Sequence, residues 1–216
     1  MAGKSNIVDL RKLLAERFPQ PLAPLSHCFA TGVPAIDQLS GGGLPKSAIT
    51  ELSSANVSAG SALLIYFLLH NAHHTGHFLA LVDGQDSFDP QPLGDARLRN
   101  LLWVRCTKAI DAIKAADLLL RDGNFPLVVL DLVLNAGGEL QKIPQTTWYR
   151  LQRLAEGGPS AFLVLTRRSM ISSAQLKLSL ENSWTLADLE QEDLSSRFKI
   201  VVQRIQAGRQ MMVGAG

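Results

Sequence analysis

Short apolar runs alternate with helical segments between residues 48 and 166, and this alternation constrains the fold more than any other feature of the sequence. We expect strands at residues 48–52, 78–82, 101–104, 127–131 and 161–165. We expect helices at residues 61–75, 109–121 and 146–156. Strands that alternate with helices form mostly parallel sheets covered on both faces. Residues 184–186 and 198–206 also read as strands, but no long helix separates them, so we expect antiparallel strands to finish this α/β sheet.

The composition supplies enough apolar material for a large core, because 46% of the residues are hydrophobic and only 19% are charged. A mainly disordered chain would be charge-rich and apolar-poor, so that class is excluded. The net charge of +2 argues against a dedicated polycation. This average hides an asymmetry: residues 1–140 carry 11 basic and 13 acidic side chains, whereas residues 141–216 carry 10 and 6. Positive charge therefore gathers in the C-terminal region.

The N-terminal region is predicted to be separate from the core. Apolar residues repeat with helical spacing between residues 7 and 18, and a proline-rich stretch up to residue 24 then ends the helix. We therefore divide the chain into a helix and linker, residues 1–24, and a core domain with a basic tail, residues 25–216. The helix can pack on its own core or act as an arm that docks on a partner protein. The candidate contact residues of this arm are Leu10, Leu13, Leu14 and Phe18.

The sequence carries no sign of export or of a membrane span. The N-terminus lacks the apolar region of a secretory signal. The longest apolar run, residues 62–69, is far shorter than the roughly 20 residues that a spanning helix needs. Cys28 and Cys106 cannot form a disulfide framework and suit a reducing compartment. We therefore expect a soluble, cytoplasmic protein with no membrane partner.

The turn before the helix at residues 61–75 is where phosphates would bind in a sheet of this kind, because loop amides and a helix N-terminus attract anions. A working phosphate-binding loop has the pattern G-x-x-x-x-G-K-[ST]. Here Ala55 stands at the first glycine position and Gly60 is retained, but Ser61 replaces the lysine and Ala62 replaces the metal-binding hydroxyl residue. We therefore expect no productive binding of Mg-ATP, no other cofactor and no enzymatic activity.

Three segments that surround this turn resemble the part of RecA-family recombinases that leads into their ATPase core. They are residues 31–37 (TGVPAID), 41–45 (GGGLP) and 49–52 (ITEL). The resemblance continues to about residue 206 and implies a RecA-like fold, with a mostly parallel, twisted sheet flanked by helices.

The same resemblance assigns two acidic positions. Residues 81–85 (LVDGQ) are similar to the family's next strand, and Gln85 falls where the family has its water-activating glutamate. Glutamine has no useful basicity, so it cannot act as a general base. Asp131 ends the strand that resembles the family's second acidic strand, whose aspartate helps to hold Mg²⁺. Lysine, hydroxyl and base are absent together, which implies a RecA-like protein that no longer hydrolyses ATP.

The short length and the altered loop are most similar to ImuA-type proteins, which are RecA-like accessory factors encoded with damage-inducible translesion polymerases. This resemblance implies a non-catalytic scaffold in the SOS response, DNA repair and induced mutagenesis, with a translesion polymerase and RecA as candidate partners. The basic tail, with Arg204 and Arg209, is similar to the end of such proteins. It is also similar to SulA, which binds the tubulin-like division protein. Residues 41–45, which SulA-like chains generally lack, favour the mutagenesis interpretation.

Two other groups of side chains give weaker signals. Arg167 and Arg168 follow the strand at residues 161–165, at the edge where RecA-type folds place their DNA-binding loop. Without stacking aromatics they are a weak indication of nucleic acid, and they equally fit a solvated loop or a patch for a protein partner. His70 and His74 lie one helical turn apart, a spacing that can bind a metal. No cysteine or carboxylate accompanies them locally, so we expect no metal site; self-association stays open.

Overall fold

A seven-stranded sheet forms the centre of the protein in the computed structural model, which describes residues 27–56, 59–185, 188 and 193–205. The strands are β1 (Cys28–Phe29), β2 (Leu44–Pro45), β3 (Ala48–Ser53), β4 (Leu79–Asp83), β5 (Leu101–Arg105), β6 (Leu127–Asp131), β7 (Ala161–Thr166), β8 (Leu176–Leu180) and β9 (Ile200–Ile205). The helices are α2 (Pro34–Leu39), α3 (Ser61–His74), α4 (Gly94–Leu98), α5 (Ala109–Asp122), α6 (Gly137–Leu140) and α7 (Gln145–Glu156), with short 3-10 turns η2 (Gln91–Leu93) and η3 (Leu194–Arg197).

The order of strands in the main sheet is β5-β4-β6-β7-β3-β8-β9. All neighbouring pairs from β5 to β8 are parallel, and β9 pairs antiparallel with β8. Strands β1 and β2 form a separate antiparallel pair. The expected α/β class, with a mostly parallel sheet and an antiparallel pair at its C-terminal end, is confirmed.

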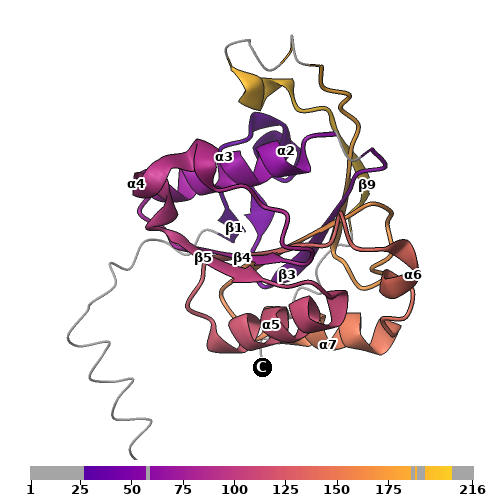
Figure 1. The fold of residues 1–216 in the computed structure, drawn as a ribbon. Helices are drawn as coiled ribbons and strands as arrows, with labels where there is room; N and C mark the ends of the chain where they lie inside the picture. Colours follow the sequence, from indigo (N-terminus) through magenta and orange to yellow (C-terminus); the bar gives the residue numbers. More distant parts are fainter. Residues whose placement is uncertain (1–26, 57–58, 186–187, 189–192, 206–216) are drawn as a thin grey trace, which may run out of the picture.

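Helices cover both faces of the sheet, as Figure 1 shows: α2, α3 and α4 lie on one face, and α5 and α7 lie on the other. Each central strand contributes side chains to both apolar layers, because successive side chains of a strand point to opposite faces of the sheet. In β7, Leu163 packs toward α3, whereas Phe162 and Val164 pack toward α5 and α7. Every residue of β4 and of β7 is buried, which explains their unbroken apolar sequences.

One predicted strand is wrong. Trp184 and Thr185 belong to no strand. The partner of β9 is instead β8, which begins eight residues before Trp184. The sequence of β8 alternates buried Leu176, Leu178 and Leu180 with two less buried polar residues, as a strand with one covered face does. Aromatic residues are common in strands, so Trp184 among polar residues favoured the prediction of a short strand. In the structure its side chain packs on the loop before α3.

The segment at residues 31–37 folds around one carboxylate. Asp37 accepts hydrogen bonds from the Thr31 backbone N–H (2.9 Å), the Thr31 hydroxyl (2.7 Å) and the Gly32 N–H (3.1 Å). These bonds fix the chain where it enters α2, and Ile36 of that helix is fully buried in the core. The threonine and the aspartate of this motif therefore have a structural role in this protein.

The predicted N-terminal arm, with Leu10, Leu13, Leu14 and Phe18, lies outside the described residues, as does Arg209 in the tail. Within the described residues, no helix is long and apolar enough to cross a lipid bilayer.

Candidate functional site at the carboxyl edge of the sheet

The loop between β3 and α3 is the position at which a parallel α/β sheet presents a phosphate site. Its first part is held to the sheet, because the Ser54 N–H donates to the Thr166 carbonyl oxygen (2.9 Å) and the Ser54 hydroxyl donates to the Asn56 carbonyl oxygen (2.6 Å). Ser61, at the position of the missing lysine, is only 7% exposed, whereas Ala62 faces solvent. Ser61 carries no positive charge, and Ala62 has no hydroxyl group.

Trp184 packs directly on this loop. Its indole Nε1–H donates to the Ala59 carbonyl oxygen at 2.8 Å, and its ring meets Phe198 edge-on with 5.7 Å between centroids. Gly60 has a φ of +104°, and a Cβ placed there would lie 2.5 Å from the indole nitrogen. The glycine retained from the phosphate-loop pattern is therefore needed here both for its backbone conformation and for the contact with Trp184.

Two aspartates lie side by side where β4 and β6 end, because Asp83 and Asp131 are partners in the register of these strands. The Asp83 carboxylate accepts backbone N–H bonds from Ser87 and Phe88, both at 2.8 Å, so it holds the turn after β4. Asp131 accepts one from Val133 at 2.9 Å. Burial raises the pKa of Asp131 to about 6, and the neighbouring Asp83 charge adds to this shift, whereas the bond from Val133 opposes it.

Gln85 extends from the turn after Asp83 and is exposed to solvent. Its Oε1 atom lies 3.4 Å from the Nδ2 atom of Asn135, a buried side chain that also donates to the Gly84 carbonyl oxygen at 2.9 Å. Gly84 itself is tightly enclosed, since a Cβ would lie 2.7 Å from the Asp131 carbonyl oxygen. Gln85 therefore lies at the exposed edge of a buried amide, Asn135, which holds the turn after β4.

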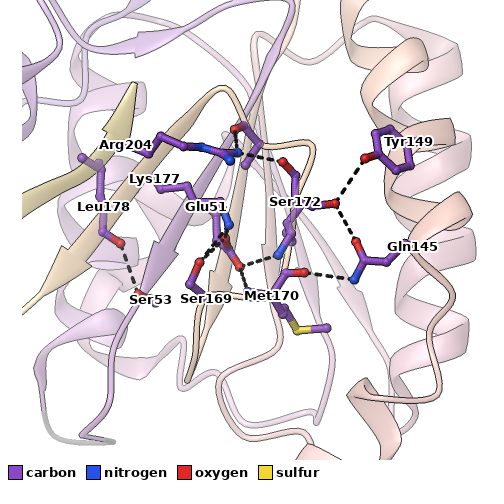
Figure 2. Close-up of polar contacts among 12 residues, drawn as sticks. Glu51, Ser53, Gln145, Tyr149, Ser169, Met170, Ser172, Lys177, Leu178 and Arg204 are labelled. Carbon is purple, nitrogen blue, oxygen red and sulfur yellow. Dashed lines mark hydrogen bonds and ion pairs between the residues drawn. The ribbon is translucent and has the colours of Figure 1, made fainter. Parts of the chain in front are cut away.

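A buried ion pair, which the sequence analysis did not single out, anchors the loop after β7. Glu51, in the middle of β3, is fully buried and pairs with Lys177 of β8 at 3.0 Å (Figure 2). Its other oxygen accepts the N–H groups of Met170 (2.6 Å) and Ile171 (3.0 Å), and the Ser169 hydroxyl donates to the same carboxylate at 3.0 Å. The available sequence signal was a lone acid inside an apolar strand.

Arg204 of β9 holds the same loop from the other side. Its Nη2 atom donates to the carbonyl oxygens of Ser172 (2.7 Å) and Ala174 (2.8 Å), as Figure 2 shows in part. The guanidinium of this candidate partner-binding residue is thus engaged within the protein. Arg209, the other arginine of the tail that is predicted to bind a partner, lies outside the described residues.

A pocket of about 600 Å³ opens between the loops that follow β3, β6 and β7. Arg167 and Arg168, which the sequence placed at this edge, are both exposed and line it. The residues that line the pocket are Ala55, Asn135, Gly137, Gly138, Leu140, Gln141, Arg167, Arg168, Ser169 and Met170. The structure thus brings Ala55, at the start of the loop between β3 and α3, next to the two arginines.

The histidines near the C-terminal end of α3 form a cluster of rings. The imidazoles of His70 and His74 meet edge-on with 4.4 Å between centroids. Burial lowers the pKa of His70, and the nearby charges of His74, Arg97 and His73 add to the effect. Among the described residues, no group of three or more histidine, cysteine or acidic side chains is placed to hold a metal ion.

Comparison with known proteins gives distant matches to recombinases. The protein RecA of Clavibacter michiganensis subsp. michiganensis is 32% identical over 135 residues, which are 61% of this chain and 34% of that protein. The protein RecA of Leifsonia xyli subsp. xyli is 31% identical over 135 residues, covering 61% of this chain and 35% of that protein. These matches support a RecA-like superfamily.

The chloroplastic DNA repair protein recA homolog 1 of Arabidopsis thaliana is also similar, with 30% identity over 112 residues, 50% of this chain and 25% of that protein. The chain spans about a third or less of the length of these curated relatives. No protein-family model matches it. The mostly parallel seven-stranded sheet flanked by helices is consistent with the RecA-like fold.

Proposed function

We propose that this chain is a non-catalytic, RecA-like accessory protein of the DNA-damage response that acts through protein contacts in translesion DNA synthesis. Its relatives include recombinases named RecA and a protein named for DNA repair. The observation that carries the non-catalytic part is the loop between β3 and α3. Ser61 and Ala62 stand in place of the lysine and hydroxyl residue, and the Trp184 indole packs on the adjacent glycine.

Two observations at the edge of the sheet support the same proposal. Asp83 and Asp131, which end β4 and β6, are engaged by backbone N–H groups of the following turns. Gln85 replaces a base with an amide that cannot accept a proton at neutral pH. A protein that keeps the fold but lacks these groups can still present surfaces to partners, because binding needs neither the lysine nor the metal.

A titration with a fluorescent ATP analogue and Mg²⁺ tests the absence of nucleotide binding. We expect no saturable binding by the full-length protein in the micromolar range. One of the related RecA proteins serves as the positive control. The double variant Ser61→Lys/Ala62→Thr restores two positions of the phosphate-loop pattern and measures how far the rest of the loop opposes the ligand. Micromolar binding by the unmodified protein would overturn the proposal.

The partner is tested separately by pull-down of a translesion polymerase with the full-length chain. We expect retention of the polymerase, and deletion of residues 1–24 should abolish it if that segment is the docking arm. Unchanged retention by the deletion variant would show that the arm is elsewhere. The SulA-like alternative predicts instead that the chain prevents sedimentation of polymerised division protein, and such an effect without polymerase binding would replace the proposed function.

A further inference from the structure

We propose that the pocket between the loops that follow β6 and β7 binds an acidic peptide segment with an apolar anchor side chain. The inference rests on the proposed function, since it names the chemistry of a protein partner. It concerns the roughly 600 Å³ pocket described above, whose volume falls within the range of about 300–1,000 Å³ typical of ligand sites. Four features of the pocket carry it: its charge, its apolar floor, its open glycine wall and its rigid frame.

The two charged side chains that line the pocket are both positive. Arg167 and Arg168 are both exposed, and neither forms an ion pair within the part of the chain that the structure describes. None of the residues that line the pocket is acidic. Glu51, which holds the loop after β7 from inside the sheet, is paired with Lys177 at 3.0 Å. Two unpaired guanidinium groups at the mouth of a pocket favour carboxylates, which they can bind in a bidentate manner.

The interior of the pocket is apolar and has room for a side chain. Leu140 is 6% exposed and Met170 is half-buried, so both offer apolar atoms to a ligand. Methionine adapts its shape to different apolar partners. Gly137 and Gly138 form a further wall, and at both positions the space where a Cβ would lie holds no atom within 4 Å. An aliphatic or aromatic anchor can therefore enter beside the glycines while neighbouring acidic residues meet the arginines.

The frame of the pocket is fixed before any ligand arrives. The Glu51 carboxylate accepts the backbone N–H groups of Met170 and Ile171 and the hydroxyl of Ser169, so the loop that carries the arginines is tied to the centre of the sheet (Figure 2). A further bond joins the Gln145 side chain of α7 to the Met170 carbonyl oxygen at 3.2 Å. A preformed loop loses little conformational entropy on binding, which favours a specific site.

The same observations make a nucleic acid the poorer occupant. No aromatic side chain lines the pocket, so unpaired bases would find no stacking surface. Nucleic-acid sites also neutralise several phosphates along a strand, whereas this pocket offers two cations and a mainly apolar interior.

Fluorescence anisotropy with the full-length protein tests the inference. The probe is a fluorescein-labelled peptide, Asp-Glu-Leu-Leu-Asp-Glu. The comparison peptides are Asn-Gln-Leu-Leu-Asn-Gln, which lacks the charge, and Asp-Glu-Ser-Ser-Asp-Glu, which lacks the apolar anchor. We expect saturable binding of the probe and affinity lower by about tenfold or more for each comparison peptide, equal to at least about 1.4 kcal/mol per change. Equal binding of all three peptides, or no binding of the probe, would overturn the inference.

Two variants locate the binding. Gly138→Phe fills the pocket without altering its charge, and Arg167→Ala/Arg168→Ala removes the charge without filling it. Each should weaken binding of the probe at least about tenfold. The charge-matched control Arg99→Ala/Arg153→Ala changes exposed arginines away from the pocket and should leave binding unchanged. Circular dichroism and the urea midpoint of each variant confirm that it folds, so loss of binding in a folded variant is attributable to the pocket.

The remaining outcomes also decide between proposals. If single-stranded oligothymidine binds, and the two pocket variants abolish that binding while the peptide probe does not bind, the pocket belongs to nucleic acid and the inference is wrong. Peptide binding that Gly138→Phe leaves intact would place the peptide elsewhere and would also overturn it. Failure of the peptide experiment leaves the ATP titration and the polymerase pull-down to decide the proposed function independently.

Discussion

At the scale of single residues, packing and hydrogen bonds fix the loop after β3 and the turn after β4. Gly60 is retained at a φ of +104°, where its missing side chain makes room for the Trp184 indole. The Asp83 carboxylate accepts backbone N–H bonds and so holds the turn that follows β4. Each side chain is explained by its contacts within the folded chain.

Gly60→Ala is expected to lower the free energy of unfolding by about 1–3 kcal/mol, because it combines a strained φ with a close contact to Trp184. Gly76→Ala is the matched control, since Gly76 has a φ of +69° but open space at the Cβ position. Urea denaturation should show the larger loss for Gly60→Ala. In a Trp184→Ala background the loss from Gly60→Ala should shrink, and an unchanged loss would refute the steric contribution of the indole.

Asp131→Asn is expected to change how stability depends on pH. The pKa of Asp131 is raised to about 6 in the folded protein from 3.8, so between these values the folded state holds a proton that the unfolded state has released. Wild-type stability from this group is therefore present below about pH 4 and is lost as pH rises to about 6, by up to about 3 kcal/mol.

The asparagine variant lacks this titration, so its stability relative to wild type should rise across the same window. Urea denaturation at pH 4.5 and pH 7.5 measures the difference, with Asp95→Asn in an exposed position of α4 as the control. A difference that stays constant with pH, or that falls, would contradict the raised pKa.

At the scale of elements, the strands that the sequence predicts best are those buried on both faces. The apolar runs of β4, β6 and β7 permit little besides a central parallel strand, and their bounds agree with the prediction to within a residue. The strand at β8 was missed although its leucines alternate with Lys177 and Ser179, the pattern of a strand with one covered face. The pairs β1 and β2 are only two residues long and carry no periodic signal.

The candidate site was predictable only in part, because only some of its features lie within short sequence patterns. Substitutions at Ser61 and Gln85 are visible in the sequence because the pattern around them is local. The contact between Trp184 and Ala59 joins positions 125 residues apart, and the bond from Met170 to Glu51 joins positions 119 residues apart. Local patterns contain no information on which distant side chains meet, so these features required the structure.

Glu51→Ala is expected to destabilise the protein by about 3–5 kcal/mol, because it leaves Lys177, whose side chain is 14% exposed, without its partner. It also leaves the N–H groups of Met170 and Ile171 without an acceptor. The double variant Glu51→Ala/Lys177→Met should lose less than the sum of the two single variants in urea denaturation. Asp86→Ala, which breaks the exposed pair with Arg105, should change stability little. Additive losses at Glu51 and Lys177 would contradict a coupled pair.

At the scale of the whole molecule, two hydrophobic layers pack on opposite faces of one sheet. Loss of either layer would expose one face of strands that also support the other layer. The central strands β4, β6, β7 and β3 have a hydrogen-bonded neighbour on each side, whereas β5 and β9 lie at the edges. The protein is therefore expected to unfold as one unit, with local opening confined to the edges.

Native-state hydrogen exchange followed by mass spectrometry tests this arrangement. Peptides that cover β6 and β7 should exchange last, at rates set by global unfolding, and peptides that cover β9 should exchange earlier. Protection of β9 equal to that of β7 would show that its outer edge is covered by another part of the chain or by a second molecule.

The hydrogen bond from Trp184 to the Ala59 carbonyl oxygen can form only late during synthesis of the chain, because the two residues are 125 positions apart. A nascent chain emerges from the ribosome N-terminus first, so β3, α3 and the loop between them leave the tunnel long before Trp184 does. Throughout that interval the loop lacks the indole that later lies against Gly60. The newly made protein therefore passes through a stage in which the loop between β3 and α3 is uncovered, and a segment translated more than a hundred residues later covers it.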